Sequence, residues 1–192
     1  MTRIRRRSFA TAAVSLGVCA AAAVVSVTTA GGSAAAESKD EPSVVGSGKL
    51  KRNPGDNAYF TIDAHGFGGE ARGTFDVSHQ YGKKFDVRFK GRIDCLLTGG
   101  PVAVATGIVT DAQVKAAPGV PMPSAAELKG KRFGFTILDS GKGGKKDRLG
   151  YSWAMDGLPV NSVGKCVSSA PFETLEKGDF TTHHWMPSRT GS

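Results

Sequence analysis

Two cysteines carry the most specific chemistry in this sequence. Cys95 and Cys166 are the thiols that remain once Cys19, in an N-terminal stretch with the features of a removable signal, is set aside. An even cysteine count in an exported chain favours a disulfide over two separately buried thiols. A zinc site would need more ligands at closer spacing, and no CxxC pair is present. We therefore predict one structural disulfide between Cys95 and Cys166, with no redox or catalytic role.

The histidines, serines and carboxylates have no spacing that is typical of catalysis or metal binding. The sequence has no HxH or HExxH pattern and no G-x-S-x-G elbow. Asp63 and Asp76 fall on the outward side of adjoining predicted strands, which is typical of a solvated face. The sequence thus predicts no catalytic residue, no metal ligand and no cofactor. An enzyme would need a deep pocket where Asp63, His65 or His79 meets another polar group and a titration is perturbed. The remaining histidines are His183 and His184.

A run of charges and glycines at residues 139–148 is the most unusual local feature. It lacks the Gly-Lys-Ser/Thr ending of a Walker A loop and the acidic positions of an EF-hand. Its cations, on a hairpin tip, could hold an anionic polymer by charge. The alternative is a soluble turn whose strands are aligned by Asp139 and Asp147. The candidate anion-binding residues are Lys142, Lys145, Lys146 and Arg148.

Strands are the elements that must position these residues, and residues 84–95 give the clearest pattern. Charged side chains occupy every second position, so one face meets water and the other meets the core. Gly91 falls on the inward face and predicts a bulge or a tight bend. By the same parity we expect the Cys95 sulfur to point into the core. The inward side chains are Phe85, Val87, Phe89, Ile93 and Cys95.

The rest of the chain continues the period-two pattern between glycine-rich turns. Residues 111–130 are interrupted by prolines and predict a long crossing loop, with one helical turn at 124–128, that could act as a lid. Pairing of short first and last strands, 49–52 and 179–182, would close or cap the sheet. We predict one all-β, mainly antiparallel domain, either a sandwich or a small closed barrel of about seven or eight strands.

The N-terminus has the order of an export signal. A basic start at Arg3 to Arg7 precedes an uncharged run, residues 9–30, and small residues end at Ala36. Arg6, Arg7 and the residues after them also fit a twin-arginine signal, so either the general or the twin-arginine route is open. A retained anchor and a lipid on Cys19 are the alternatives to cleavage. We predict a signal peptide at 1–36, a flexible spacer at 37–43, the β domain at 44–185 and a C-terminal tail at 186–192.

The charge balance becomes ordinary without this leader. The chain has 25 basic and 17 acidic residues and a net charge of +8, and four arginines but no acidic residue lie in the leader. The predicted mature part therefore carries about +4, and no basic, aromatic-interleaved nucleic-acid motif is present. Specific binding to nucleic acid is not expected.

Several segments of the mature part resemble a known group of proteins. The chain resembles small secreted actinobacterial proteins of unknown function, some of which are labelled repetin-like. The resemblance implies export and β structure, and it implies no activity and no functional residues. The segments that carry it are residues 46–48, 71–75, 91–96, 99–103, 139–148 and 171–173.

The sequence leaves three classes of function open. A non-catalytic binding or cell-surface interaction domain, secreted or held at the cell wall, is favoured because the chain offers a scaffold with long loops and no reactive constellation. Its partner could be an acidic wall polymer or another envelope protein, with no membrane span after signal removal. An extracellular hydrolase with an unrecognised site and a structural envelope protein are the alternatives.

Overall fold

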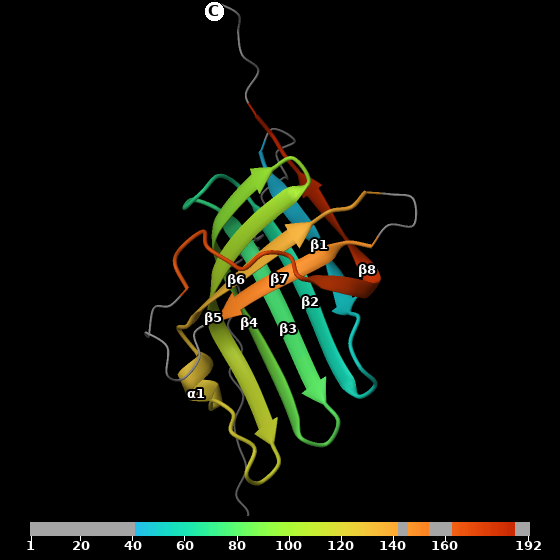
Figure 1. Cartoon of the computed structure of the whole chain (residues 1–192). Coiled ribbons are helices and arrows are strands. Elements are labelled where there is room, and N and C mark those ends of the chain that lie inside the picture. The colour runs from blue at the N-terminus through green and yellow to red at the C-terminus, as the bar shows by residue number, and fades with distance from the viewer. Residues whose placement is uncertain (1–40, 142–145, 154–162, 187–192) are drawn as a thin grey trace, which may run out of the picture. The chain divides into compact units, whose positions relative to one another are not determined.

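Eight antiparallel strands form a closed barrel in the computed structural model, which describes residues 41–141, 146–153 and 163–186. Each strand pairs with the next, and the last returns to the first (Figure 1). The all-β prediction is confirmed, and the closed barrel is the architecture observed. All described residues belong to one compact unit, Glu37–Ser192. The strands are β1 (Ser43–Leu50), β2 (Asp56–His65), β3 (Arg72–Tyr81), β4 (Phe85–Gly99), β5 (Val102–Ala116), β6 (Arg132–Leu138), β7 (Arg148–Trp153) and β8 (Glu173–His183).

The first and last strands close the barrel, and both are longer than the sequence pattern indicates. β1 pairs with β8 along its whole length, whereas the alternation predicts only residues 49–52 and 179–182. Gly46 and Gly48 hide the inward parity of β1, because a glycine adds no side chain to the pattern. A Cβ on Gly46 would run into the backbone and ring of Phe180 on β8. The glycines therefore let the two strands approach closely while large side chains of β8 fill the core.

Phe75 of β3 lies at the centre of this core. Its side chain is 2% exposed, and its ring centroid lies 5.1 Å from that of Phe135 and 6.5 Å from that of Phe133. A Cβ on Gly91 of β4 or Gly107 of β5 would meet the Phe75 ring. The register shifts beside Gly91, as the predicted bulge requires. Both glycines therefore make room for one large ring.

The direction of Cys95 was predicted wrongly from its parity. A second bulge on β4, between Ile93 and Cys95, pairs Cys95 with Thr106 of β5. The Thr106 hydroxyl faces outward and accepts a hydrogen bond from the Cys166 backbone N–H at 3.2 Å. Cys95 is fully buried on the outside of the barrel wall, beneath a covering segment, because the extra residue at Asp94 reverses the alternation.

The covering segment, residues 163–172, crosses the outer surface of β6 and β7, and we call it the strap. The predicted Cys95–Cys166 disulfide holds it to β4. Glycines beneath it allow the close approach, because a Cβ on Gly134 would meet the Val167 carbonyl and one on Gly150 would meet the Ala170 carbonyl. The strap lies beside the shortest seam of the barrel, since β7 and β8 pair at only two positions. It therefore reinforces the barrel where the backbone ladder is weakest.

The predicted loop 111–130 is shorter than expected. β5 continues to Ala116, because Asp111, Gln113 and Lys115 face water while their neighbours face the barrel. Beyond it lie a proline-rich segment and the predicted helical turn, α1 (Ala125–Leu128). Ser124 and Glu127 cap this turn reciprocally, with hydrogen bonds of 3.2 and 2.6 Å.

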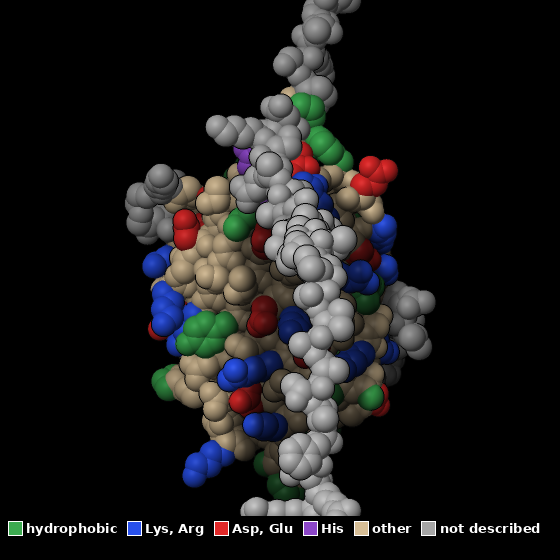
Figure 2. All heavy atoms as spheres, turned by 180° about the vertical axis from the view of Figure 1, so that it is seen from behind, with side chains coloured by type: hydrophobic (Ala, Val, Ile, Leu, Met, Phe, Trp, Pro, Cys, Tyr) green, Lys and Arg blue, Asp and Glu red, His purple; other side chains and the backbone are tan. Residues whose placement is uncertain are grey.

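The outward side chains of the barrel mix both signs of charge. Figure 2 shows basic and acidic side chains interspersed over one face. On the strands, Asp76 of β3 and Asp111 of β5 both lie opposite Lys90 of β4. This part of the described surface therefore presents no field of one sign.

Candidate binding site at one end of the barrel

The two ends of the barrel are built differently. At one end, here called the closed end, the residues after β8 cross towards β4. His184 Nδ1 lies 3.0 Å from the Thr98 hydroxyl, and the Trp185 ring packs on Phe67 with centroids 5.3 Å apart. The opposite end, here called the cavity end, is formed by the β1–β2 turn, the β3–β4 turn and the connection from β5 to β6.

A small apolar cavity lies inside the cavity end. Its volume is about 50 Å³, roughly a third of the ~150 Å³ cavity that binds benzene in an engineered protein. Met122, from the proline-rich connection after β5, contributes to the lining, so part of the predicted lid does cover a cavity. The other lining residues are Arg52, Ala58, Phe60, Val77, His79, Val87, Phe89, Phe133 and Tyr151.

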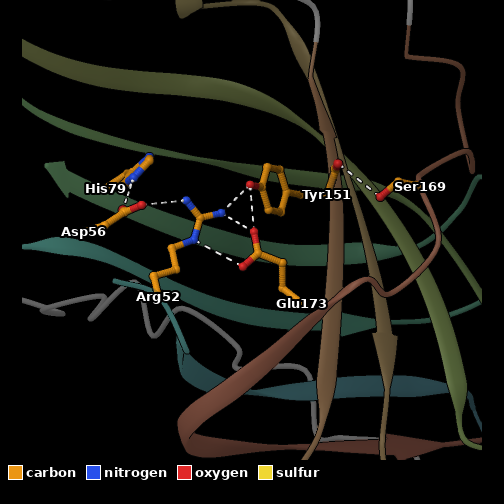
Figure 3. Close-up of polar contacts among 6 residues, drawn as sticks. All are labelled: Arg52, Asp56, His79, Tyr151, Ser169 and Glu173. Atoms are coloured by element: carbon orange, nitrogen blue, oxygen red, sulfur yellow. Dashed lines mark hydrogen bonds and ion pairs between the residues drawn. The ribbon is translucent and has the colours of Figure 1, made fainter. Parts of the chain in front are cut away.

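Arg52 organises the polar groups at the mouth of this cavity (Figure 3). Its guanidinium pairs with both oxygens of Glu173, donates to the Tyr151 hydroxyl at 2.5 Å and lies 3.3 Å from Asp56 Oδ2. Tyr151 in turn donates to Glu173 Oε1 at 3.1 Å. His79 Nε2 lies 2.6 Å from the other oxygen of Asp56. These five residues, the Arg52 network, come from β2, β3, β7, β8 and the β1–β2 turn.

The network holds the barrel together across its short seam. Arg52 follows β1, Tyr151 lies in the second half of β7 and Glu173 begins β8. The contacts of Arg52 therefore join three strands where β7 and β8 share few backbone hydrogen bonds. Ser169 of the strap adds a bond from its hydroxyl to the Tyr151 carbonyl at 3.1 Å (Figure 3). The hydrogen bonds of Arg52, unlike that of Ser169, are charge-assisted, and bonds of this type contribute about 1.5–3 kcal/mol each. The mouth of the cavity is therefore a rigid frame.

Partial burial sets the protonation states of the frame. Burial raises the pKa of the Tyr151 phenol, with Arg52 opposing the effect and the Glu173 charge adding to it. For Arg52, burial acts against the charged form, but the hydrogen bond with Glu173 and the electrostatic interactions with Tyr151 and Glu173 raise the pKa overall. At neutral pH the phenol thus keeps its proton as a hydrogen-bond donor, and the guanidinium stays charged.

Of the histidines considered from the sequence, only His79 reaches the cavity. His65 pairs with Asp63 at 2.6 Å near the closed end. His183 is exposed at the end of β8. Among the described residues, no group of three or more His, Cys, Asp or Glu side chains is arranged to hold a metal ion.

Of the predicted anion-binding residues, the two that the structure describes do not line the cavity. Lys142 and Lys145 lie outside the described residues. Lys146 and Arg148 are exposed, and Arg148 donates to the Phe172 carbonyl at 3.3 Å. Their accumulation into one basic site stays a prediction.

The two carboxylates of the alternative interpretation do bind backbone N–H groups beside that hairpin, whose tip lies outside the described residues. Asp147 is buried and accepts backbone N–H groups of Ser140 at 2.9 Å and Phe180 at 2.7 Å. Asp139 accepts the N–H groups of Gly141 at 2.8 Å and Thr182 at 2.9 Å. Both carboxylates therefore tie the β6–β7 hairpin, and through it β8, into place.

Sequence reasoning missed most of the Arg52 network. Arg52 and Glu173 are 121 positions apart, and no local pattern links them. One signal was available, because Tyr151 falls on the apolar parity of β7, where an inward phenol needs a hydrogen-bond partner. That partner could have been sought among the charged residues at the ends of other strands.

Comparisons with protein-family models, with curated proteins and with solved structures give no significant match to this chain. The site is therefore interpreted from its own geometry. No helix among the described residues is both long and apolar enough to cross a membrane.

Proposed function

We propose that this protein is an exported, non-catalytic binding protein that takes the apolar part of a small molecule into the cavity end of its barrel. The observation that carries the proposal is an apolar cavity whose mouth is framed by a few fixed polar groups, the usual composition of a small-molecule site. The interior of an eight-stranded barrel is just wide enough either to be filled by side chains or to hold one small ligand. Export is supported by the leader pattern and is compatible with the disulfide.

The lining favours binding over hydrolysis. It includes His79, held by Asp56, which is the convergence that an enzyme would require. However, the described lining contributes no serine, threonine or cysteine that His79 could activate. The Tyr151 phenol, whose pKa is raised by burial, serves as a donor and not as a base at neutral pH. These groups fit recognition of a ligand's polar end.

The cavity admits a larger ligand if Met122 moves. Its present volume of about 50 Å³ holds only a short apolar group. Met122 lies on the segment between β5 and α1 and is only half buried. A methionine side chain changes rotamer easily. The connection after β5 would then act as a lid with one flexible side chain as its inner surface.

A neutral fluorescent probe tests the proposal. We expect N-phenyl-1-naphthylamine to bind the mature protein saturably with increased fluorescence. Ala58→Leu fills the cavity from β2 and should weaken binding at least about tenfold, because it removes the apolar space. Met122→Ala enlarges the cavity and should strengthen binding, which keeps the test decisive if Ala58→Leu folds poorly.

The control variant is Leu97→Ser near the end of β4 at the closed end, where the Leu97 side chain is 50% exposed. It removes exposed apolar surface without touching the cavity, so binding should be unchanged. Absence of saturable binding would refute the proposal. So would a result in which Leu97→Ser loses binding of the probe and Ala58→Leu keeps it.

A further inference from the structure

Aromatic rings lead from the cavity to the outer rim of the barrel. The His79 ring lines the cavity and meets Phe85 edge to face, with centroids 4.9 Å apart. Phe85 lies 5.9 Å from Tyr81. Tyr81 is 38% exposed, so this path ends in solvent at the β3–β4 turn. An apolar group leaving the cavity by this side would remain in contact with rings.

Lysines stand at the outer end of this path. Lys84 Nζ lies 4.8 Å from the centroid of the Tyr81 ring. Lys83, Lys84 and Lys115 line one groove of about 400 Å³ together with Phe85. All three lysines are exposed. Lys115 faces Asp86 across the β4–β5 pair, but the ion pair that Asp86 makes is with Arg88. We call them the lysine rim.

The turns around the mouth hold this rim against the cavity. The Gly82 N–H donates to the Gly55 carbonyl of the β1–β2 turn at 2.8 Å, and the Ala117 N–H donates to the Lys84 carbonyl at 2.8 Å. The three segments that border the mouth are thus joined by backbone hydrogen bonds. The lysine rim is therefore part of the same frame as the cavity and not a separate flexible loop.

Each of the carboxylates considered around the mouth has a cationic partner. Asp56 and Glu173 share the single positive charge of Arg52, so these three groups together carry one net negative charge. Asp86, which lines the lysine groove, lies 3.5 Å from the Arg88 guanidinium. The three positive charges of the lysine rim exceed the one negative charge left over, so the net charge of these groups is positive beside the ring path. An anion placed there would gain favourable interactions without displacing an existing ion pair.

We propose that the ligand is an amphipathic anion, whose apolar end enters the cavity and whose anionic head is held by Lys83, Lys84 and Lys115. The inference rests on the proposed function and adds the chemical class of the ligand. The charges of the lysine rim attract the anionic head of the ligand, a contribution to affinity that Arg52, already paired, does not supply. The chain of the ligand lies along Phe85 and Tyr81 between the two ends.

Displacement of the neutral probe by three ligands of equal chain length tests this inference. Decanoate should displace the probe at about a tenfold lower concentration than decanol or decyltrimethylammonium, since several exposed charge contacts each contribute a factor of a few. The preference should shrink in 0.5 M salt, because screening shortens the range of exposed charges. Within a series of shorter carboxylates, each buried methylene should add about fourfold.

The triple variant Lys83→Gln, Lys84→Gln, Lys115→Gln should bring decanoate to the affinity of decanol and leave decanol unchanged. The matched control changes three exposed lysines elsewhere, Lys90→Gln, Lys146→Gln and Lys177→Gln, with the same loss of charge, and should keep the preference. Equal binding of decanoate and decanol, or equal effects of the two triple variants, would overturn the inference while leaving the proposed function standing. Failure of the probe and of all three ligands to bind refutes the proposed function itself.

Discussion

Removal of the Cys95–Cys166 disulfide should destabilise the barrel at the β7–β8 seam and leave β3 and β4 folded. In the double variant Cys95→Ala, Cys166→Ala the strap keeps its hydrogen bonds, such as that from the Ser169 N–H to the Ser152 hydroxyl at 2.9 Å, and the packing of Phe172 on the Tyr151 ring, but it loses its covalent link to β4. The strap then no longer clamps the seam where β7 and β8 pair at two positions. The loss should therefore appear first at that seam.

The magnitude follows from the loop that the disulfide closes. A sequence separation of 71 corresponds in the loop-entropy model to about 4.4 kcal/mol at 25 °C. Part of this is offset, because Cys166 has φ of 61°, and a non-glycine residue held in the left-handed region costs about 1–2 kcal/mol. A freed Cys166→Ala can relax. The net loss should be about 3 kcal/mol, which in a domain of this size lowers the melting temperature by roughly 6–12 °C.

Thermal unfolding of the mature protein, with and without the double substitution, measures this loss. Hydrogen exchange supplies the local readout, because amides of β7, β8 and the strap should exchange faster while those of β3 and β4 stay protected. Thiol titration of the denatured, unreduced protein should find no free thiol in the parent. Two free thiols per chain, or a melting temperature lowered by less than about 2 °C, would contradict the reasoning.

Three further predictions concern the core, the mouth and the leader. Gly107→Ala should lower the free energy of unfolding, measured in urea, by about 1–3 kcal/mol, because its methyl group would collide with the Phe75 ring. The control is Gly99→Ala, whose methyl group would have no heavy atom within 4 Å, and it should change the free energy of unfolding by less than about 0.5 kcal/mol. Burial raises the pKa of the Tyr151 phenol, so the folded chain holds the phenol proton more tightly than the unfolded chain does. The contribution of this proton to the free energy of unfolding is complete below about pH 10 and is lost as the pH rises through the pKa of the folded state. An alkaline absorbance titration should show one late phenol that Tyr151→Phe removes; an unchanged curve in this variant would disprove the assignment. Mass spectrometry of secreted protein should find its N-terminus at or near Glu37, whereas an intact Met1 in the membrane fraction would show that the leader is retained.

The strands of this fold could be predicted wherever polar and apolar residues alternate without interruption. Residues 84–95 show this, and even the inward position of Gly91 and its bulge were predictable from parity. The alternation does not predict side-chain direction beyond Asp94, where one extra residue turns Cys95 to the outside of the barrel wall. A bulge leaves no mark in the alternation unless a glycine accompanies it, so parity cannot be carried across it.

The disulfide and the candidate site differ in how much the sequence reveals. Once Cys19 is set aside with the predicted leader, the two remaining cysteines have one possible partner each, so their pairing could be predicted without geometry. Arg52 and Glu173 each have many possible partners, and the barrel closure that joins them is a property of the whole sheet. The cavity likewise depends on side-chain volumes from five strands and on Met122 of the lid. Such features arise from packing, which local patterns do not encode.

The methyl resonance of Met122 gives the most direct test of ligand entry at the cavity end. The protein is labelled at methionine methyl groups and titrated with decanoate, and Met122→Leu assigns the signal. Met186, 64% exposed beyond β8 at the closed end, is the internal reference. We expect a saturable shift of the Met122 methyl signal while the Met186 signal stays in place. A saturable shift at Met186 with an unmoved Met122 signal would contradict it.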